Sequence, residues 1–220
     1  MKRVIQVTIA LGLIGLSLAG CSSFLPKPNP NATRIFVLFP DIEAAERQNS
    51  DPSTQISLGV GPVRLPAYLD RREIVMRVAP SRFDLSENDR WAEPLDENLT
   101  RVLAQNLSIL LGSDQIIPYP WPLDQKPHYR VEIQVLRFES DSAGEIQLSA
   151  RWTVIDDTGK ETPNQKASRL TRRAKEKSTD GSIAALSETV ADLSREIAKT
   201  IIAVDRQREG SGKDFSLRSK

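Results

Sequence analysis

The chain has 220 residues, with 30 Lys and Arg, 29 Asp and Glu and one His, which gives a formal net charge of +1 at pH 7. A charge this close to zero gives no overall electrostatic reason to expect nucleic-acid binding. There is one cysteine, so an internal disulfide is excluded and packing has to stabilise the fold.

The chain starts with a basic pair, Lys2 and Arg3, and then an apolar run over 4–20 that has no ionisable side chain. A transmembrane helix needs about 20 predominantly apolar residues, and this run is at the short edge of that range. A basic start, a short apolar run and small residues at its end are typical of a secretory signal.

The letters LAGC at the end of this run fit the bacterial lipobox, in which a cysteine thiol accepts a diacylglycerol. We therefore expect a signal peptide over 1–20, cleavage between Gly20 and Cys21, and lipidation of Cys21. Ser22 and Ser23 follow in place of Asp, which favours the outer membrane, and several acyl chains hold a protein firmly. An ordinary signal peptide with an incidental cysteine, or a signal anchor with a free thiol, stays open.

After the signal, residues 21–33 are rich in proline and asparagine, which predicts an extended, lipidated tether. Compact or alternating apolar runs then predict strands. A polar stretch over 41–54 predicts a loop between the first two of them. The predicted strands of this first part are 34–39, 55–63, 73–78 and a short one at 82–85.

A first helix is predicted after Pro94, because leucines recur at spacings of three and four as far as Leu110 and Gly112 suits a carboxyl-terminal cap. A second apolar stripe predicts a helix over 182–204. The charged residues 205–220 predict a disordered tail.

Between the helices, a short strand in 114–122 precedes two segments, 128–140 and 144–156, in which apolar and polar residues alternate. The alternation predicts a β-hairpin with one face buried and the other exposed to solvent. A highly charged strand over 166–178 suits an edge. Residues 34–204 thus predict a single α+β domain: a mixed, mostly antiparallel sheet with two main amphipathic helices packed on it.

Side chains that carry out catalysis are sparse. His128 is the only histidine, and a metal site needs several converging ligands. The chain has no G-x-S-x-G nucleophile motif and no phosphate-binding glycine loop. The adjacent Asp156 and Asp157 suit a turn. We expect no catalytic residue, no metal and no cofactor, and hence a protein that is not an enzyme.

Two polar clusters are candidate contact surfaces. The first is a basic surface on the charged strand, for which the alternative is a solvated edge; as a binding surface it would meet anionic headgroups or an acidic partner. Its members are Arg169, Arg172, Arg173 and Lys175.

The second cluster lies between two predicted strands, where tyrosine and arginine, both common at protein interfaces, occur together. A plain strand connection is the alternative. The candidate partner contacts are Tyr68, Leu69, Arg71 and Arg72.

Four segments, in their order and spacing, resemble the PqiC-type lipoproteins of the ABC-type transport auxiliary component family. They are LGVGPVRLPAYLDRREIVMR, RWAEPLDENLTRVLAQNL, YRVEIQVLRFE and LSETVADLSREIA, and the resemblance extends from about Arg34 to Ala203. It implies an outer-membrane lipoprotein that faces the periplasm and serves a lipid transport system built on MCE (mammalian cell entry) domains. Such a protein would engage the periplasm-spanning MCE protein and support envelope integrity.

Three functional hypotheses follow. The first is a docking subunit for the MCE protein that self-associates, because a collar around a tube needs several copies. The alternative is a stand-alone periplasmic lipid carrier, whose sheet and helices would enclose an acyl-sized cavity. The third is a passive structural lipoprotein, whose deletion would leave envelope permeability unchanged.

Overall fold

The structure is a computed structural model that describes residues 32–47, 56–122, 124–159 and 165–218, with burial and side-chain contacts given as far as Arg208. Residue contacts divide the chain into Met1–Ala32 and Thr33–Lys220, and every element below belongs to the second unit. The expected signal peptide, its cleavage site at Gly20 and the lipidation site Cys21 lie outside the described residues.

The described residues form one eight-stranded sheet centred on the long strand β6 (Tyr129–Asp141). One edge of β6 pairs antiparallel with β7 (Glu145–Asp156), which pairs antiparallel with the edge strand β8 (Lys166–Arg173). The other edge is shared: the start of β6 pairs parallel with β2 (Leu58–Arg64), and its end pairs parallel with β3 (Glu73–Ala79). The longest ladders are therefore antiparallel in a mixed sheet, as the sequence predicts.

Two further groups of strands extend the sheet from β2 and β3. Strand β5 (Ile116–Pro118) pairs parallel with β2, whereas β4 (Arg82–Trp91) pairs antiparallel with β3 and parallel with β1 (Arg34–Phe36). The strand predicted at 82–85 is present and starts at Arg82 as expected, but it is longer than predicted, because β4 continues through the polar residues to Trp91. At the end of this stretch Asp89 and Arg90 pair with β1, and Arg90 also pairs with Glu73 of β3, which the sequence pattern does not show.

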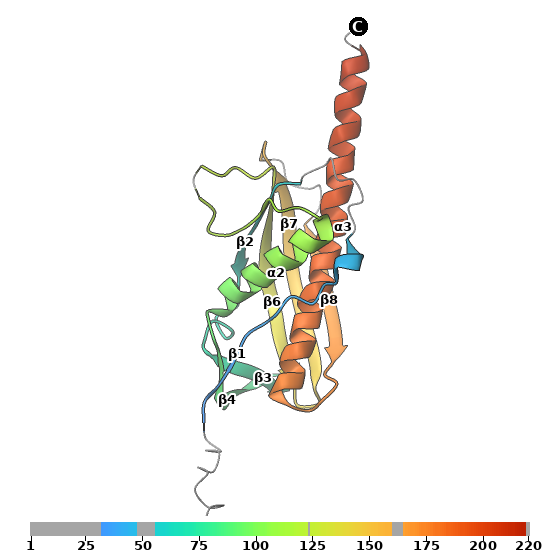
Figure 1. Cartoon of the computed structure of the whole chain (residues 1–220). Coiled ribbons are helices and arrows are strands. Elements are labelled where there is room, and N and C mark those ends of the chain that lie inside the picture. Colours follow the sequence, from blue (N-terminus) through green and yellow to red (C-terminus); the bar gives the residue numbers. More distant parts are fainter. Residues whose placement is uncertain (1–31, 48–55, 123, 160–164, 219–220) are drawn as a thin grey trace, which may run out of the picture. The chain divides into compact units, whose positions relative to one another are not determined.

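Helices α2 (Leu95–Leu111) and α3 (Thr179–Arg218) pack on the same face of the sheet and against each other (Figure 1). The predicted first helix is confirmed, with Pro94 at its amino-terminal cap and Gly112 at its carboxyl-terminal cap. Gly112 has φ 57°, a left-handed conformation that glycine adopts readily, and its N–H donates to the carbonyl of Ile109 at 3.2 Å. A short 3₁₀ helix, η1 (Ala44–Glu46), lies between β1 and β2 in the chain.

The second helix is longer than the sequence predicts, since α3 is helical to Arg218 where 205–220 was expected to be a disordered tail (Figure 1). Two contacts hold the start of this continuation to the sheet. The Tyr129 hydroxyl donates to Asp205 at 2.9 Å, and Arg208 pairs with Asp157 at 3.1 Å. Arginine, glutamine and glutamate also favour helix, so a charged composition alone does not indicate disorder here.

The amino-terminal segment after β1 lies across the helices. The backbone N–H of Leu38 donates to the side chain of Asn98 on α2 at 2.8 Å, and the N–H of Phe39 donates to Ser187 on α3 at 3.3 Å. Leu38 is buried, whereas Ile35 and Phe39 are 61% and 42% exposed. One side of this segment thus completes the core, and the other presents apolar side chains to solvent.

Candidate functional site

The loop between β2 and β3 is held by a buried carboxylate on β6. Glu139 is 2% exposed and accepts hydrogen bonds from the Tyr68 hydroxyl at 2.8 Å, Arg77 Nε at 2.9 Å and Arg137 Nε at 3.1 Å. Bonds from charged donors to a carboxylate are stronger than those between neutral groups. The loop is therefore fixed to the sheet by Tyr68.

The Tyr68 ring also stacks on the Phe83 ring, with 4.5 Å between their centroids. The Arg77 guanidinium lies 4.2 Å from the centroid of the Phe83 ring. Burial first, and then the hydrogen bond to Glu139, raises the pKa of the Tyr68 hydroxyl, so it remains a donor near neutral pH. Leu69 is 2% exposed and belongs to the core. The structure thus places Tyr68 and Leu69 within the fold, where the sequence analysis expected contact residues.

Arg71 and Arg72 occupy the exposed end of the same loop. Their backbones are fixed: the N–H of Arg71 donates to the carbonyl of Leu69 at 2.9 Å, and the carbonyl of Arg72 accepts from Trp91 at 2.8 Å. Both side chains are exposed and make no ion pair with any described residue. Two cationic side chains thus project from a rigid loop.

The predicted basic surface is divided by strand β8. Arg172 faces α3, where it pairs with Asp192 at 2.7 Å and with Glu188 at 2.9 Å, and Lys175 pairs with Glu188 at 3.1 Å. Both cations are thus paired with acids of α3, Arg172 at a part-buried position and Lys175 at an exposed one, so neither is an unpaired charge on the predicted basic surface. For Arg172 the reason is the strand alternation, which turns every second side chain of β8 toward the helices, whereas Lys175 lies beyond the end of the strand.

Arg169 and Arg173 lie on the other face of β8 and are exposed. They stand opposite Ser149 and Glu145 of β7 in the antiparallel ladder. These two arginines lie on the face of the sheet that the helices leave uncovered, whereas Lys175, which is also exposed, pairs with α3.

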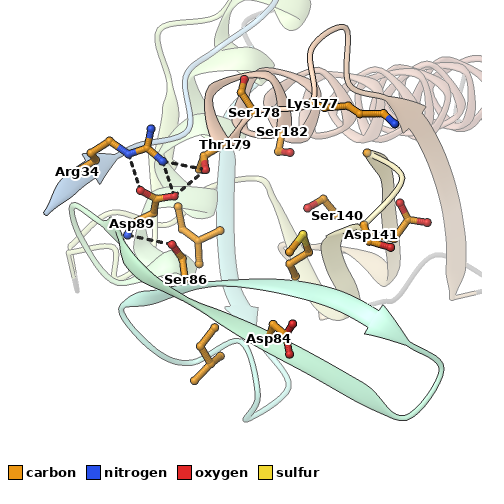
Figure 2. A pocket seen from close by; sticks show the side chains of 15 residues that line it. Arg34, Asp84, Ser86, Asp89, Ser140, Asp141, Lys177, Ser178, Thr179 and Ser182 are labelled. Carbon is orange, nitrogen blue, oxygen red and sulfur yellow. Dashed lines mark hydrogen bonds and ion pairs between the residues drawn. The ribbon is translucent and has the colours of Figure 1, made fainter. Parts of the chain in front are cut away.

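A cavity of about 440 Å³ opens between strands β3 and β4, the turn after β6 and the start of α3 (Figure 2). One wall holds an ion pair in which Arg34 donates from Nε and Nη2 to the two Asp89 oxygens at 2.7 and 2.8 Å. The Thr179 hydroxyl donates to the same carboxylate at 2.6 Å. Burial acts to raise the pKa of Asp89, but the hydrogen bonds from Arg34 and Thr179 bring it below its ordinary value.

The cavity lining has an apolar part, which we call its floor, and a polar part that forms its walls. Ile74, Met76 and Leu85 line the floor. Side chains from the segment before α3, from α3 itself, from β4 and from the end of β6 complete the lining; among them are Lys177, Ser178, Ser182, Asp84, Ser140 and Asp141.

Sequence reasoning missed this cavity, because its residues come from segments far apart in the chain. Its one recognisable feature in the sequence is the polar stretch within β4, which follows the short strand that the sequence predicts at 82–85. The described residues contain no group of three His, Cys, Asp or Glu side chains arranged to hold a metal. Among the described helices, none is both long and apolar enough to cross a membrane.

Comparisons with known proteins place this fold in a family. The family model described as ABC-type transport auxiliary lipoprotein component matches residues 36–198. The intermembrane transport lipoprotein PqiC of Escherichia coli K12 is 27% identical over 146 residues, which cover 66% of this chain and 71% of that protein. PqiC of Shigella flexneri matches to the same extent.

Solved structures share the fold. A crystal structure of a protein from Xanthomonas campestris has a TM-score of 0.64 at 16% identity, covering 80% of this chain and 99% of that one. Another crystal structure has a TM-score of 0.63 at 22% identity, covering 77% of this chain and 99% of that one. Because the family model spans most of the folded unit, the chain belongs to the ABC-type transport auxiliary lipoprotein component family.

Proposed function

We propose that this protein is a non-enzymatic subunit of an MCE-type intermembrane lipid transport system. Lipidated at Cys21, it is anchored in the outer membrane and faces the periplasm. There it docks the periplasm-spanning MCE protein and supports envelope integrity. Membership of a transport auxiliary lipoprotein family and the similarity to PqiC support this assignment.

The observation that carries the docking role is the rigid loop bearing Arg71 and Arg72. A preorganised loop loses little conformational entropy on binding, and arginine is a frequent anchor at protein interfaces. The buried Glu139 and the stacked Tyr68 supply that rigidity. Arg71 and Arg72 are thus the proposed contacts, and Tyr68 positions them.

Self-association belongs to the same proposal, because several copies are needed to surround a tube-like partner. The exposed apolar row of the amino-terminal segment supports it, since apolar side chains grouped on a surface favour association. Ile35, Val37 and Phe39 form that row and are 61%, 42% and 42% exposed.

The alternative of a stand-alone lipid carrier requires an acyl-sized space between the sheet and the helices. Buried side chains from both layers fill the described part of that space: Leu107 of α2, Val131 of β6 and Ile197 of α3 are each 0% exposed. Close packing of this kind argues for a binding module over a carrier with an interior lipid.

The test is affinity purification of the full-length, lipidated protein in mild detergent, with mass spectrometry of proteins and lipids together. We expect an MCE-domain protein to co-purify, and an Arg71→Glu, Arg72→Glu variant to recover far less of it. Arg206→Glu, an exposed arginine on α3, is the matched control. Recovery of stoichiometric phospholipid without any protein partner would contradict the docking role and support the carrier.

The anchor is tested separately with Cys21→Ala. This variant should leave the domain folded but release it from the membrane fraction, and cells should show the envelope defect of a deletion. A normal envelope permeability in both the variant and the deletion strain would instead support a passive structural lipoprotein.

A further inference from the structure

We propose that the cavity beside Arg34 binds a zwitterionic phospholipid, with part of an acyl chain on its apolar floor and the headgroup between its charged walls. This inference goes beyond the docking role, because the cavity is formed by β3, β4, the turn after β6 and the start of α3, and the loop bearing Arg71 and Arg72 does not line it. Its volume of about 440 Å³ lies within the usual range for small-molecule sites.

The floor requires an apolar ligand group. Met76 and Leu85 line the cavity and remain 38% and 44% exposed, and Ile74, which also lines it, is 9% exposed. Large apolar side chains left uncovered in a concave, polar-rimmed site are typical of ligand grooves. A hydrocarbon chain is the ligand group that would cover them.

The charged side chains that line the cavity indicate which kind of lipid headgroup it would bind. Arg34 and Asp89 neutralise each other through two hydrogen bonds, so they offer little charge to a ligand. Figure 2 shows Lys177, Ser178 and Ser182 on the α3 side, with Asp84 across the cavity from them. Lys177 makes no ion pair with any described residue.

A second carboxylate lies between these walls. Asp141 uses Oδ1 to accept the N–H groups of Ala143 and Glu145, both at 2.8 Å, and its Oδ2 accepts no hydrogen bond from a described residue. One free ammonium group and two carboxylates therefore surround the cavity. A phosphate would be placed at Lys177 and the serine hydroxyls, and an ammonium at Asp84 and Asp141. Asp84 also makes a long, exposed ion pair with Arg82, with 4.0 Å between Oδ1 and Nε, so a bound ammonium would compete with Arg82 there. A headgroup with a net negative charge would lack the ammonium that pairs with these two carboxylates.

The length of chain before the folded unit limits how far the cavity could lie from the proposed anchor. Arg34, which lines it, is the second residue of the folded unit. A tether from Cys21 to Thr33 reaches at most roughly 40 Å when fully extended. The proposed anchor would thus keep the cavity close to the membrane, although binding of phospholipid to the cavity does not depend on the anchor.

The test uses the full-length protein in mild detergent with a phosphatidylethanolamine that carries a photoactivatable acyl chain, followed by mapping of the labelled peptides. Labelling should concentrate in residues 74–85 and fall about tenfold in Met76→Asp, Leu85→Asp. Leu136→Asp is the matched control, since Leu136 is 38% exposed on β6 and does not line the cavity. Equal labelling of the double variant and of wild type would overturn the proposal.

The headgroup is tested on folded protein with Lys177→Ala and Asp84→Asn, which alter exposed side chains and leave the floor intact. Each should weaken labelling by phosphatidylethanolamine, and the same lipid with a phosphatidylglycerol headgroup should label wild type less. Equal labelling by a diacylglycerol probe, or full competition by glycerophosphoethanolamine without acyl chains, would contradict binding of an intact phospholipid. No MCE partner is present, so this outcome is independent of the docking test.

Discussion

The Tyr68 hydroxyl lies 2.8 Å from Oε2 of Glu139, although 71 residues separate the two in the chain. This bond joins the loop after β2 to the end of β6, and Arg77 and Arg137 donate to the same carboxylate. A buried carboxylate is stable only when such partners satisfy it. The rigidity of the loop therefore depends on the buried carboxylate of Glu139.

Tyr68→Phe removes the hydroxyl but keeps the ring on Phe83. We expect the free energy of unfolding to fall by about 1.5 kcal/mol, because one donor to a buried carboxylate is lost. Denaturant titration measures the change. Tyr119→Phe is the control, since Tyr119 is 49% exposed; its effect should stay within about 0.5 kcal/mol. Equal losses in the two variants would show that the bond to Glu139 adds nothing.

Asn98→Leu should detach the amino-terminal segment from α2. Asn98 is 1% exposed, accepts from the N–H of Leu38 at 2.8 Å and donates to Glu93 at 2.7 Å. Leucine has a similar volume but leaves the Leu38 N–H without an acceptor, which costs about 1–3 kcal/mol. Hydrogen exchange at Leu38 and denaturant titration report the change. Gln105→Leu, on the exposed side of the same helix, should leave both measurements unchanged.

Asp89→Asn should alter the response of stability to acid. The folded-state pKa of Asp89 is below its ordinary value of 3.8, so the carboxylate stabilises the fold fully above that value and loses this effect as pH falls through the folded pKa. Wild type should exceed the variant in free energy of unfolding at pH 7, and the difference should shrink below about pH 4. A difference that stays constant from pH 7 to pH 2.5 would contradict the assignment. Asp180→Asn, an exposed acid on α3, serves as control.

Asp205→Ala tests whether the continuation of α3 is fastened to the sheet. Tyr129 is 2% exposed, and its hydroxyl bonds to Asp205 at 2.9 Å. Burial, followed by this bond, raises the pKa of Tyr129 to about 12, so the hydroxyl stays a donor at neutral pH. Losing the acceptor should cost about 1–2 kcal/mol in thermal or denaturant unfolding. Arg206→Ala removes an exposed neighbour and should have little effect; a comparable loss there would mean that the variant acts through helix propensity.

Local sequence rules predicted the elements whose stability is local. Pro94, the leucine spacing and Gly112 fixed both ends of α2, because caps and periodicity act within a few residues. The alternation in β6 and β7 likewise predicted their hairpin, and the structure confirms it.

The same rules fail at Glu139. Tyr129, Val131, Ile133 and Val135 face the helices, and strict alternation would turn Glu139 to that side as well. The ladder shifts register between Val135 and Arg137, however, so Phe138 takes the inward position and Glu139 the outward one. Its burial then comes from Tyr68, which reaches it from another part of the chain. Neither the bulge in β6 nor the contact of Tyr68 with Glu139 can be predicted from a single sequence.

Strand β1 also determines how the domain would respond to a pulling force. Tension on the chain ahead of Thr33 would reach the folded unit first at Arg34. The guanidinium of Arg34 donates two hydrogen bonds to the Asp89 carboxylate. Strand β1 is paired over Arg34–Phe36 only, and the next fastening is the bond from Leu38 to Asn98. A protein pulled at this end would therefore carry the load first on the ion pair between Arg34 and Asp89 and on the short β1–β4 ladder, before it reaches Leu38 in the core.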